Sequence, residues 1–226
     1  AGFHNVNVDL MFGIPGQTRD GWEKSLRIVA ALNPEHISAY SLIIEEGTPF
    51  AARNLKLPDE DTEYQMYEDT ARILGEYGFE QYEISNYAKP GYMCRHNAGY
   101  WQRREYLGFG LGASSLYREL RFSNTRRMQE YLTDSGKLEQ IRKEVTVLSR
   151  NEQIEEFMFL GLRMTEGISE KLFKETFGVR IMDIYGDILQ KYEAIGFMEH
   201  IETKWCLTRK GIHVSNHILA DFLLDE

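Results

Sequence analysis

The strongest constraint on the fold is a strand–helix–strand pattern near the beginning of the chain. Apolar residues alternate over residues 5–12, which predicts a strand. The turn GIPGQT follows, and Thr18 is placed to cap a helix over about 19–32. Residues 36–44 are mostly apolar and predict a second strand, buried on both faces. Two strands joined by a helix lie parallel in one sheet, so the pattern predicts an α/β fold.

The middle of the chain continues with a helix and a third strand. The helix is expected to begin at Asp59 or Asp61 and to end near Tyr77. Residues 81–88 predict a strand, and residues 125–135 predict another helix. Residues 89–124 between them are rich in glycine and have little regular period. A loop of that length in a compact domain is usually a binding segment or a lid.

The last third of the chain has a different pattern. Helices are predicted over 151–163, 169–176 and 181–194, followed by a hairpin-like pair of strands within 196–211 and a helix from about 209. This order indicates a small winged-helix-like α+β domain at 126–226, after a first domain at 1–125. Residues 151–226 carry eight basic and fourteen acidic side chains. A DNA-binding winged helix needs a basic face, so we expect no nucleic-acid partner.

Composition narrows the class of protein further. The formal net charge is −9, which disfavours nonspecific binding of nucleic acid. No apolar run approaches the ~20 residues that a membrane-spanning helix needs. Two cysteines far apart in the chain do not make a disulfide framework, which indicates a reducing, cytoplasmic environment. The chain starts without Met and runs almost at once into a strand, so we expect it to be a fragment of a longer protein.

One segment departs from the acidic balance. Residues 86–127 hold eight basic and two acidic side chains, together with eight aromatic rings. Aromatic rings offer flat apolar faces, and guanidinium groups pair with carboxylate or phosphate. The segment is therefore suited to a flat anionic ligand.

The stretch CRHNAGYW lies in this segment and admits several interpretations. Cys94 and His96 could ligate a metal, but a structural zinc site needs four ligands, and Cys206 is the only other thiol. A Cys–His nucleophilic dyad needs side chains that converge, which residues two positions apart rarely do. His96 could be a hydrogen-bonded loop histidine, or it could face a ligand beside the two rings that follow. Haem iron is often held by histidine, and haem propionates by arginine.

Three other features have both a structural and a functional interpretation. GIPGQT is not a phosphate-binding P-loop, because its spacing is short and Gln17 stands where lysine is needed. It remains a strand-to-helix turn whose backbone N–H groups could face a ligand. Asp9 is either a solvated or salt-bridged carboxylate, or an acceptor for a ribose hydroxyl. GFGLGASS, residues 108–115, permits the close approach of a ligand or of neighbouring backbone.

The chain resembles the HemN/HemW group of radical S-adenosylmethionine proteins over residues 5–125. Five motifs in order carry the resemblance: VDLMFGIPGQT, LNPEHISAYSLIIEEGTPF, YEISNYAKPG, CRHNAGYW and YLGFGLGASS. The group includes oxygen-independent coproporphyrinogen III oxidases and haem chaperones. The resemblance implies the C-terminal part of a partial (β/α)6 barrel, followed by the winged-helix-like domain. The pattern HN-x-x-YW, which comprises His96, Asn97, Tyr100 and Trp101, resembles the HemW branch.

The resemblance also implies cofactors and the residues that hold them. S-adenosylmethionine would lie over Asp9, which matches the family's ribose carboxylate, with Met11 and Ile43 around the adenosyl group. Haem would lie near His96, a candidate ligand of its iron. The family binds a [4Fe–4S] cluster through C-x-x-x-C-x-x-C, a motif that this sequence lacks. We therefore expect the cluster ligands to lie outside the sequence, and this chain alone not to cleave S-adenosylmethionine.

Several functions follow as alternatives. The first is part of a HemW-like protein that binds haem or a porphyrin and passes it to a haem-accepting protein. The second is a coproporphyrinogen III oxidase, which converts two propionates to vinyl groups; its candidate carboxylate contacts are Arg103, Arg104, Arg118 and Arg121. The third is an interaction module built on the C-terminal domain, and the last is a globular fragment without an intact site.

Overall fold

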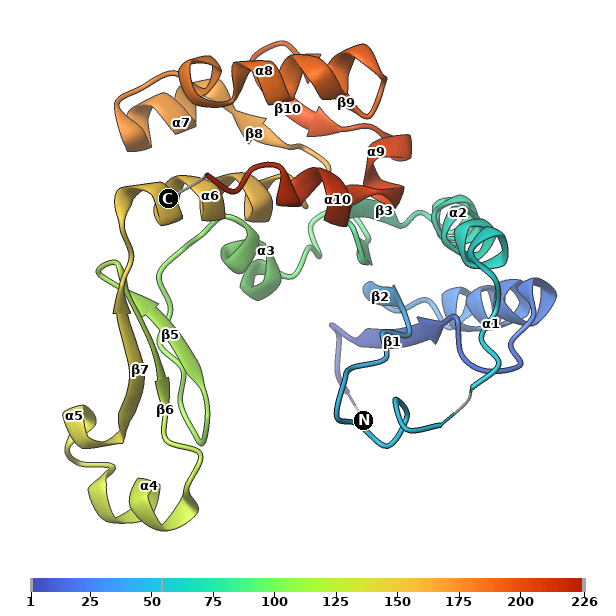
Figure 1. The fold of residues 1–226 in the computed structure, drawn as a ribbon. Coiled ribbons are helices and arrows are strands. Elements are labelled where there is room, and N and C mark those ends of the chain that lie inside the picture. The colour runs from blue at the N-terminus through green and yellow to red at the C-terminus, as the bar shows by residue number, and fades with distance from the viewer. Residues whose placement is uncertain (1, 54, 225–226) are drawn as a thin grey trace. The chain divides into compact units, whose positions relative to one another are not determined.

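The structure is a computed structural model that describes residues 2–53 and 55–224. Its chain divides into two compact units, Ala1–Arg95 (unit 1) and His96–Glu226 (unit 2) (Figure 1). The domain boundary predicted after residue 125 falls inside the second unit. Ion pairs from Arg103 and Arg121 to Glu156 tie the segment before that boundary to the C-terminal part.

Unit 1 contains a four-stranded sheet in the order β1-β2-β4-β3. β1 (Asn7–Phe12) and β2 (His36–Ser41) run parallel and are joined through α1 (Arg19–Ala31), which confirms the predicted strand–helix–strand unit. The Thr18 hydroxyl accepts a hydrogen bond from the Gly21 backbone N–H at 3.2 Å and caps α1, as expected.

The prediction of one strand over 81–88 is wrong, because this segment folds into a tight hairpin. β3 (Glu80–Glu83) and β4 (Asn86–Ala88) pair antiparallel, and β4 also pairs antiparallel with β2. The buried Glu83 carboxylate makes the turn: it accepts hydrogen bonds from the Ser85 backbone N–H at 2.9 Å and from the Asn86 side chain. A turn that is held by a buried carboxylate cannot be predicted from the spacing of apolar residues.

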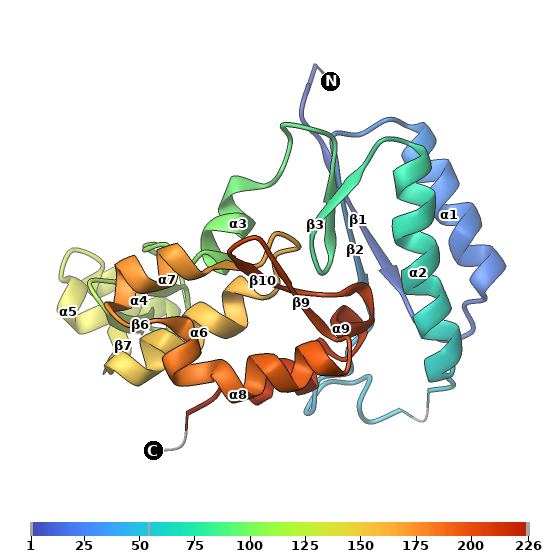
Figure 2. The same cartoon turned by 90° about the horizontal axis from the view of Figure 1, so that it is seen from above.

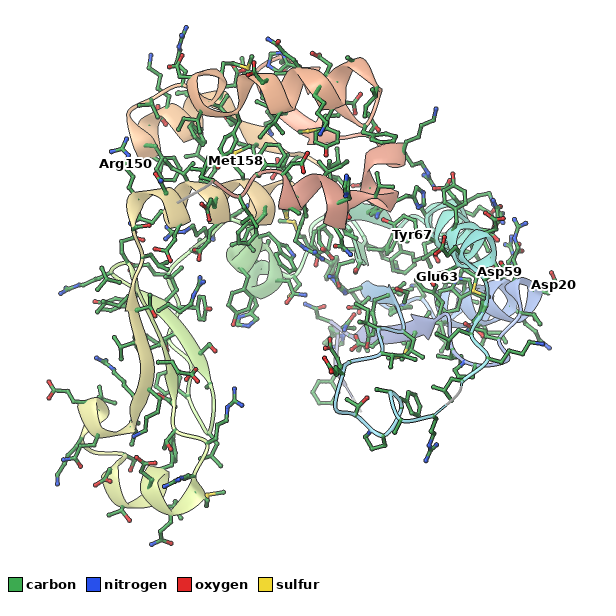
Figure 3. All side chains as sticks on the ribbon, viewed as in Figure 1. Asp20, Asp59, Glu63, Tyr67, Arg150 and Met158 are labelled. Carbon is green, nitrogen blue, oxygen red and sulfur yellow. The ribbon has the colours of Figure 1, made fainter. Side chains whose placement is uncertain are left out.

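Two helices cover one face of this sheet, α1 and α2 (Glu60–Glu76) (Figure 2). Asp59 caps α2 by accepting a hydrogen bond from the Thr62 backbone N–H at 2.7 Å, and it is labelled at the start of the helix in Figure 3. Trp22 is fully buried in the core between helices and sheet, and its indole N–H donates to the Thr70 hydroxyl at 2.9 Å. On the other face, β1 presents the exposed residues Asn7, Asp9 and Met11, whereas the polar residues His36 and Ser38 of β2 are buried.

The segment from 89 to 124 has more regular structure than expected. α3 (Arg95–Trp101) precedes a hairpin of β5 (Ser114–Tyr117) and β6 (Leu120–Asn124). The hairpin turn consists of two residues with positive φ, 50° at Arg118 and 60° at Glu119. Such turns usually carry Asn or Gly. The expectation of an irregular loop is therefore wrong at these residues. The hairpin was not foreseen because its turn contains neither Asn nor Gly.

β6 also pairs with a third strand, β7 (Arg142–Val147), so that these strands form an antiparallel sheet in the order β5-β6-β7. Between β6 and β7 lie α4 (Met128–Asp134) and α5 (Leu138–Ile141). α4 confirms the helix predicted over 125–135.

The C-terminal part of unit 2 confirms the predicted winged-helix-like order. Its helices and strands are α6 (Arg150–Gly161), β8 (Ile168–Ser169), α7 (Glu170–Phe177), α8 (Ile181–Ala194), β9 (Met198–Ile201) and β10 (Lys204–Leu207). The helix expected from about 209 is two short ones, α9 (Arg209–His213) and α10 (Ser215–Ala220). The helices pack with the β8-β10-β9 sheet around an apolar core that includes Met158 of α6, labelled in Figure 3. Among the described residues, no helix is long and apolar enough to cross a membrane.

Candidate functional site

The open face of the sheet in unit 1 carries the first group of predicted site residues. Along β1, Asp9 and Met11 are exposed, whereas Leu10 and Phe12 pack in the core. Asp9 and Met11 therefore share one face, as strand alternation requires. Ile43, just beyond β2, is 72% exposed. All three side chains are accessible to a ligand.

A chain of hydrogen bonds crosses this face from Asp9 to the segment before α3. Asn7 Nδ2 donates to Asp9 Oδ1 at 2.5 Å, and His36 Nδ1 lies 2.6 Å from Asn7 Oδ1. His36 Nε2 lies 2.8 Å from the Tyr82 hydroxyl, which is hydrogen-bonded to the Cys94 backbone. Sequence reasoning missed Asn7, His36 and Tyr82. For Asn7 and His36, the signal available was their polarity inside strands that otherwise follow an apolar pattern. Tyr82 lies in β3, whose sequence EQYE is mostly polar, so no such signal marked it.

The partners give this chain of hydrogen bonds a direction. The Asn7 amide N–H is used on Asp9, so the Asn7 carbonyl accepts from His36 Nδ1–H. The neutral His36 ring then accepts at Nε2 from the Tyr82 hydroxyl. Burial lowers the pKa of His36, against a smaller opposing effect of the Asp9 carboxylate, and burial raises the pKa of Tyr82. Both groups are thus favoured in their neutral forms.

The ends of β1 and β2 lie at the edge where parallel α/β sheets usually bind ligands. Gly13 follows β1 with a φ of 72°, and Gly16 has a φ of 76°. These conformations favour glycine and explain the GIPGQT turn. The carboxylate of Glu63, labelled on α2 in Figure 3, lies close to Gly13. Glu63 is a charged group beside the strand ends that the sequence did not reveal.

The residues of this chain do not fit a [4Fe–4S] cluster. Such a cluster takes several cysteine thiolates. The sequence has two cysteines, Cys94 and Cys206, and Cys206 is buried. Among the described residues there is no group of three or more His, Cys, Asp or Glu side chains arranged to hold a metal ion.

The second group of predicted site residues lies on α3 in unit 2. The rings of His96 and Tyr100 meet edge to face with centroids 4.7 Å apart, and those of Tyr100 and Tyr106 do so at 4.6 Å. His96 is the exposed end of this row, and Asn97 is half-buried beside it. An exposed imidazole backed by two aromatic rings can face a flat ligand.

Trp101 ends α3 and is held by a neighbouring cation. The Arg163 guanidinium lies over the Trp101 ring, 4.3 Å from its centroid. The indole nitrogen of Trp101 is buried and has no acceptor among the described residues. Buried donors are rarely left unpaired, so this one needs an explanation.

The four arginines predicted as carboxylate contacts differ in their partners and in their exposure. Arg103 and Arg121 donate to Glu156 at 3.0 and 2.5 Å, and Arg103 also pairs with Glu119 at 2.6 Å. The side chain of Glu156 is 6% exposed, so these contacts are structural ones that the sequence did not reveal. Arg104 is exposed and has no ion pair among the described residues. Arg118 is also exposed and lies over the Tyr117 ring.

A pocket of 420 Å³ opens beside Trp101 within unit 2. Trp101 and Arg104 line it from the α3 side, and Phe157, Ile168 and Leu172 from α6, β8 and α7. It thus joins two of the predicted ligand residues to the C-terminal part of the chain. Its volume lies in the range of small-molecule pockets.

Comparison with known proteins finds relatives over nearly the whole chain. Residues 148–214 match the model of the HemN C-terminal domain. The chain is 36% identical over 226 residues to the heme chaperone HemW of Bacillus subtilis, which covers 98% of this chain and 60% of that protein. It is 32% identical over 229 residues to the heme chaperone HemW of Escherichia coli, which covers 99% and 59%. The chain thus spans about 60% of the length of these curated relatives.

A solved structure shares the fold. It is coproporphyrinogen III oxidase (HemN) from Escherichia coli, described as a radical SAM enzyme. It matches with a TM-score of 0.78 and 19% identity, over 98% of this chain and 55% of that one. At that identity the likeness concerns the fold, and it confirms the predicted α/β architecture.

Proposed function

We propose that this chain takes part in the handling of haem or a related porphyrin, because it belongs to the HemN/HemW-like family of radical S-adenosylmethionine proteins. The observation that carries the proposal is the row of rings His96–Tyr100–Tyr106, whose outer member is an exposed imidazole. Histidine is a common ligand of haem iron, and aromatic rings pack against a macrocycle. The curated relatives named as heme chaperones support the same role.

A haemin titration of this chain, followed at the Soret band, tests the proposal. We expect a saturable shift in the wild-type chain and its loss in His96→Ala, with His217→Ala as a control on α10. A shift that survives in His96→Ala would keep haem binding and remove His96 as a ligand. A wild-type chain that shows no saturable shift would contradict haem binding by this chain.

The proposal extends to the binding of S-adenosylmethionine by the parent protein, the longer protein of which this chain is expected to be a part. Asp9 would accept a hydrogen bond from a ribose hydroxyl, and Met11 and Ile43 would pack against the adenosyl group; the exposure of all three supports this assignment. Asn7 would hold the Asp9 carboxylate in place. The [4Fe–4S] cluster of this family would need cysteines that are not part of this sequence, so we derive no chemical step from it.

Isothermal calorimetry with S-adenosylmethionine tests the Asp9 assignment. We expect Asp9→Asn to weaken binding about tenfold, the cost of one charge-assisted hydrogen bond. The matched control is Asp20→Asn, which changes an exposed carboxylate on the first turn of α1 (Figure 3). Equal loss of affinity in both variants would remove the specific role of Asp9.

The oxidase alternative has less support. The likeness to the oxidase concerns the fold, and two of the four arginines proposed as its carboxylate contacts are bound to Glu156. Formation of protoporphyrinogen by the parent protein would overturn our preference for a chaperone.

The proposal includes a haem-accepting protein as partner, a cytoplasmic location and no binding of nucleic acid. The acidic balance of residues 151–226 supports the last point.

A further inference from the structure

The pocket beside Trp101 combines an apolar wall with a single available cation. Trp101, Phe157, Met164, Ile168 and Leu172 supply apolar surface to its lining. Pockets for small molecules are lined in this way, by apolar and aromatic side chains with a few polar groups that orient the ligand. The lining therefore favours a ligand with an extended apolar body.

The charges at the pocket favour an anionic group on that ligand. Lys204 and Glu166 both line the pocket, but their charged atoms pair with each other at 3.0 Å. Arg104 also lines the pocket, is exposed, and has no ion pair within the described ranges 2–53 and 55–224. A guanidinium group without a partner is a strong and geometrically specific site for a carboxylate.

We infer that this pocket binds the carboxylate-bearing edge of a flat apolar ring system, with Arg104 pairing with the carboxylate and the ring edge lying between Trp101 and Leu172. The inference rests on the proposed function, because a tetrapyrrole with propionate groups has this chemistry. It goes further in giving the HemN C-terminal domain a direct part in the ligand site, through α6, β8 and α7. The pocket is distinct from the proposed iron-binding position at His96, because His96 does not line the pocket.

A metal-free porphyrin isolates this pocket from any bond between His96 and iron. The probes are protoporphyrin IX and its dimethyl ester, which keeps the ring and lacks free carboxylates, both titrated by porphyrin fluorescence in the same detergent. We expect protoporphyrin IX to bind the wild-type chain and the diester to bind about tenfold more weakly, as loss of a charge-assisted pair predicts.

Two variants change the pocket at exposed positions, where the fold tolerates substitution. Arg104→Gln removes the cation, and we expect it to weaken protoporphyrin IX about tenfold while leaving the diester unchanged. Leu172→Glu places an anion at the wall, where Leu172 is 51% exposed, and should weaken the free acid more than the diester. The controls are Arg127→Gln and Ile195→Glu, which make the same changes at exposed side chains of unit 2 outside the pocket.

The outcomes separate this inference from the proposed function. If the wild-type chain binds haemin and protoporphyrin IX but Arg104→Gln and Leu172→Glu behave like their controls, the pocket assignment is overturned and the proposed function stands. Equal weakening of acid and diester by Arg104→Gln would also overturn it, because the arginine would then not act on the carboxylate. If neither probe binds the wild-type chain, the proposed function fails and the pocket assignment fails with it.

Discussion

Arg103 and Arg104 are neighbours in the chain whose side chains lie in different surroundings. The side chain of Arg103 is 10% exposed and is held between Glu119 and Glu156, whereas that of Arg104 is open to solvent. Arg103 has a φ of 52°, which turns the backbone after α3. A basic residue in a segment that is expected to bind a ligand can therefore stabilise the fold instead.

We expect Arg103→Met to destabilise the protein and to leave ligand binding intact. The change leaves Glu156 with Arg121 as its remaining ion-pair partner, and losing a charge-assisted bond to a buried carboxylate costs about 2 kcal/mol. Urea denaturation followed by circular dichroism measures the loss. Arg118→Met is the control, since Arg118 is exposed. A stable Arg103→Met protein that no longer binds porphyrin would instead make Arg103 a ligand contact.

His36 should make the stability depend on pH. Burial lowers its folded-state pKa below the ordinary value of 6.5, so the unfolded chain binds a proton more readily than the folded one. Stability is then complete above pH 6.5 and falls as the pH drops from that value toward the folded-state pKa. Urea midpoints at pH 7.5 and 5.5 should differ less in His36→Gln than in the wild-type chain. An equal difference in both proteins would mean that His36 does not contribute to it.

At the scale of elements, β8 and β10 approach each other so closely that the residue before β8 must be glycine. Gly167 has a φ of 66°, and a Cβ atom there would overlap the Trp205 carbonyl oxygen of β10. Gly178, which ends α7, has a similar φ of 72° but open space around it. The two glycines separate the cost of steric overlap from that of backbone conformation.

Gly167→Ala should therefore cost much more stability than Gly178→Ala. We expect a loss of about 3 kcal/mol for the first, from overlap together with unfavourable φ, and about 1 kcal/mol for the second, from φ alone. Thermal unfolding of both variants gives the comparison. Similar losses would show that β10 moves away from the new methyl group at little cost.

At the scale of the whole molecule, the residues that the structure describes form two apolar cores, one in each unit. The core of unit 1 is built around Trp22 and Met66, and that of unit 2 around Phe173 and Tyr185. Segments with their own core open and close as cooperative units. Damage to one core should therefore spread within its unit before it reaches the other.

Hydrogen exchange measured by mass spectrometry tests this independence. In Gly167→Ala, we expect faster exchange in α8, which packs in the core of unit 2, and unchanged exchange in α2, which packs in the core of unit 1. Gly178→Ala serves as the mild control for the same unit. Faster exchange in both helices would show that the two cores unfold together.

The local elements follow largely from the amino-acid pattern. The parallel strand–helix–strand unit, the Thr18 and Asp59 caps and the helices after residue 149 were all predictable, because periodicity and capping act over a few neighbouring residues. The ordered motifs also sufficed to identify the family. The hairpin at Glu83 and the hairpin at Arg118 were not predictable, because neither two-residue turn carries a glycine-containing pair of the kind that is typical of hairpins.

The sequence by itself thus determined the α/β beginning, the winged-helix-like end and the residue types available to a ligand. Only the tertiary structure decided which of those residues are free to meet one. It bound Arg103 to Glu156, 53 positions away, and linked His36 to Tyr82, 46 positions away. The physical reason is that these contacts depend on how distant segments pack, and a side chain's type and local spacing carry no information about a partner so far along the chain.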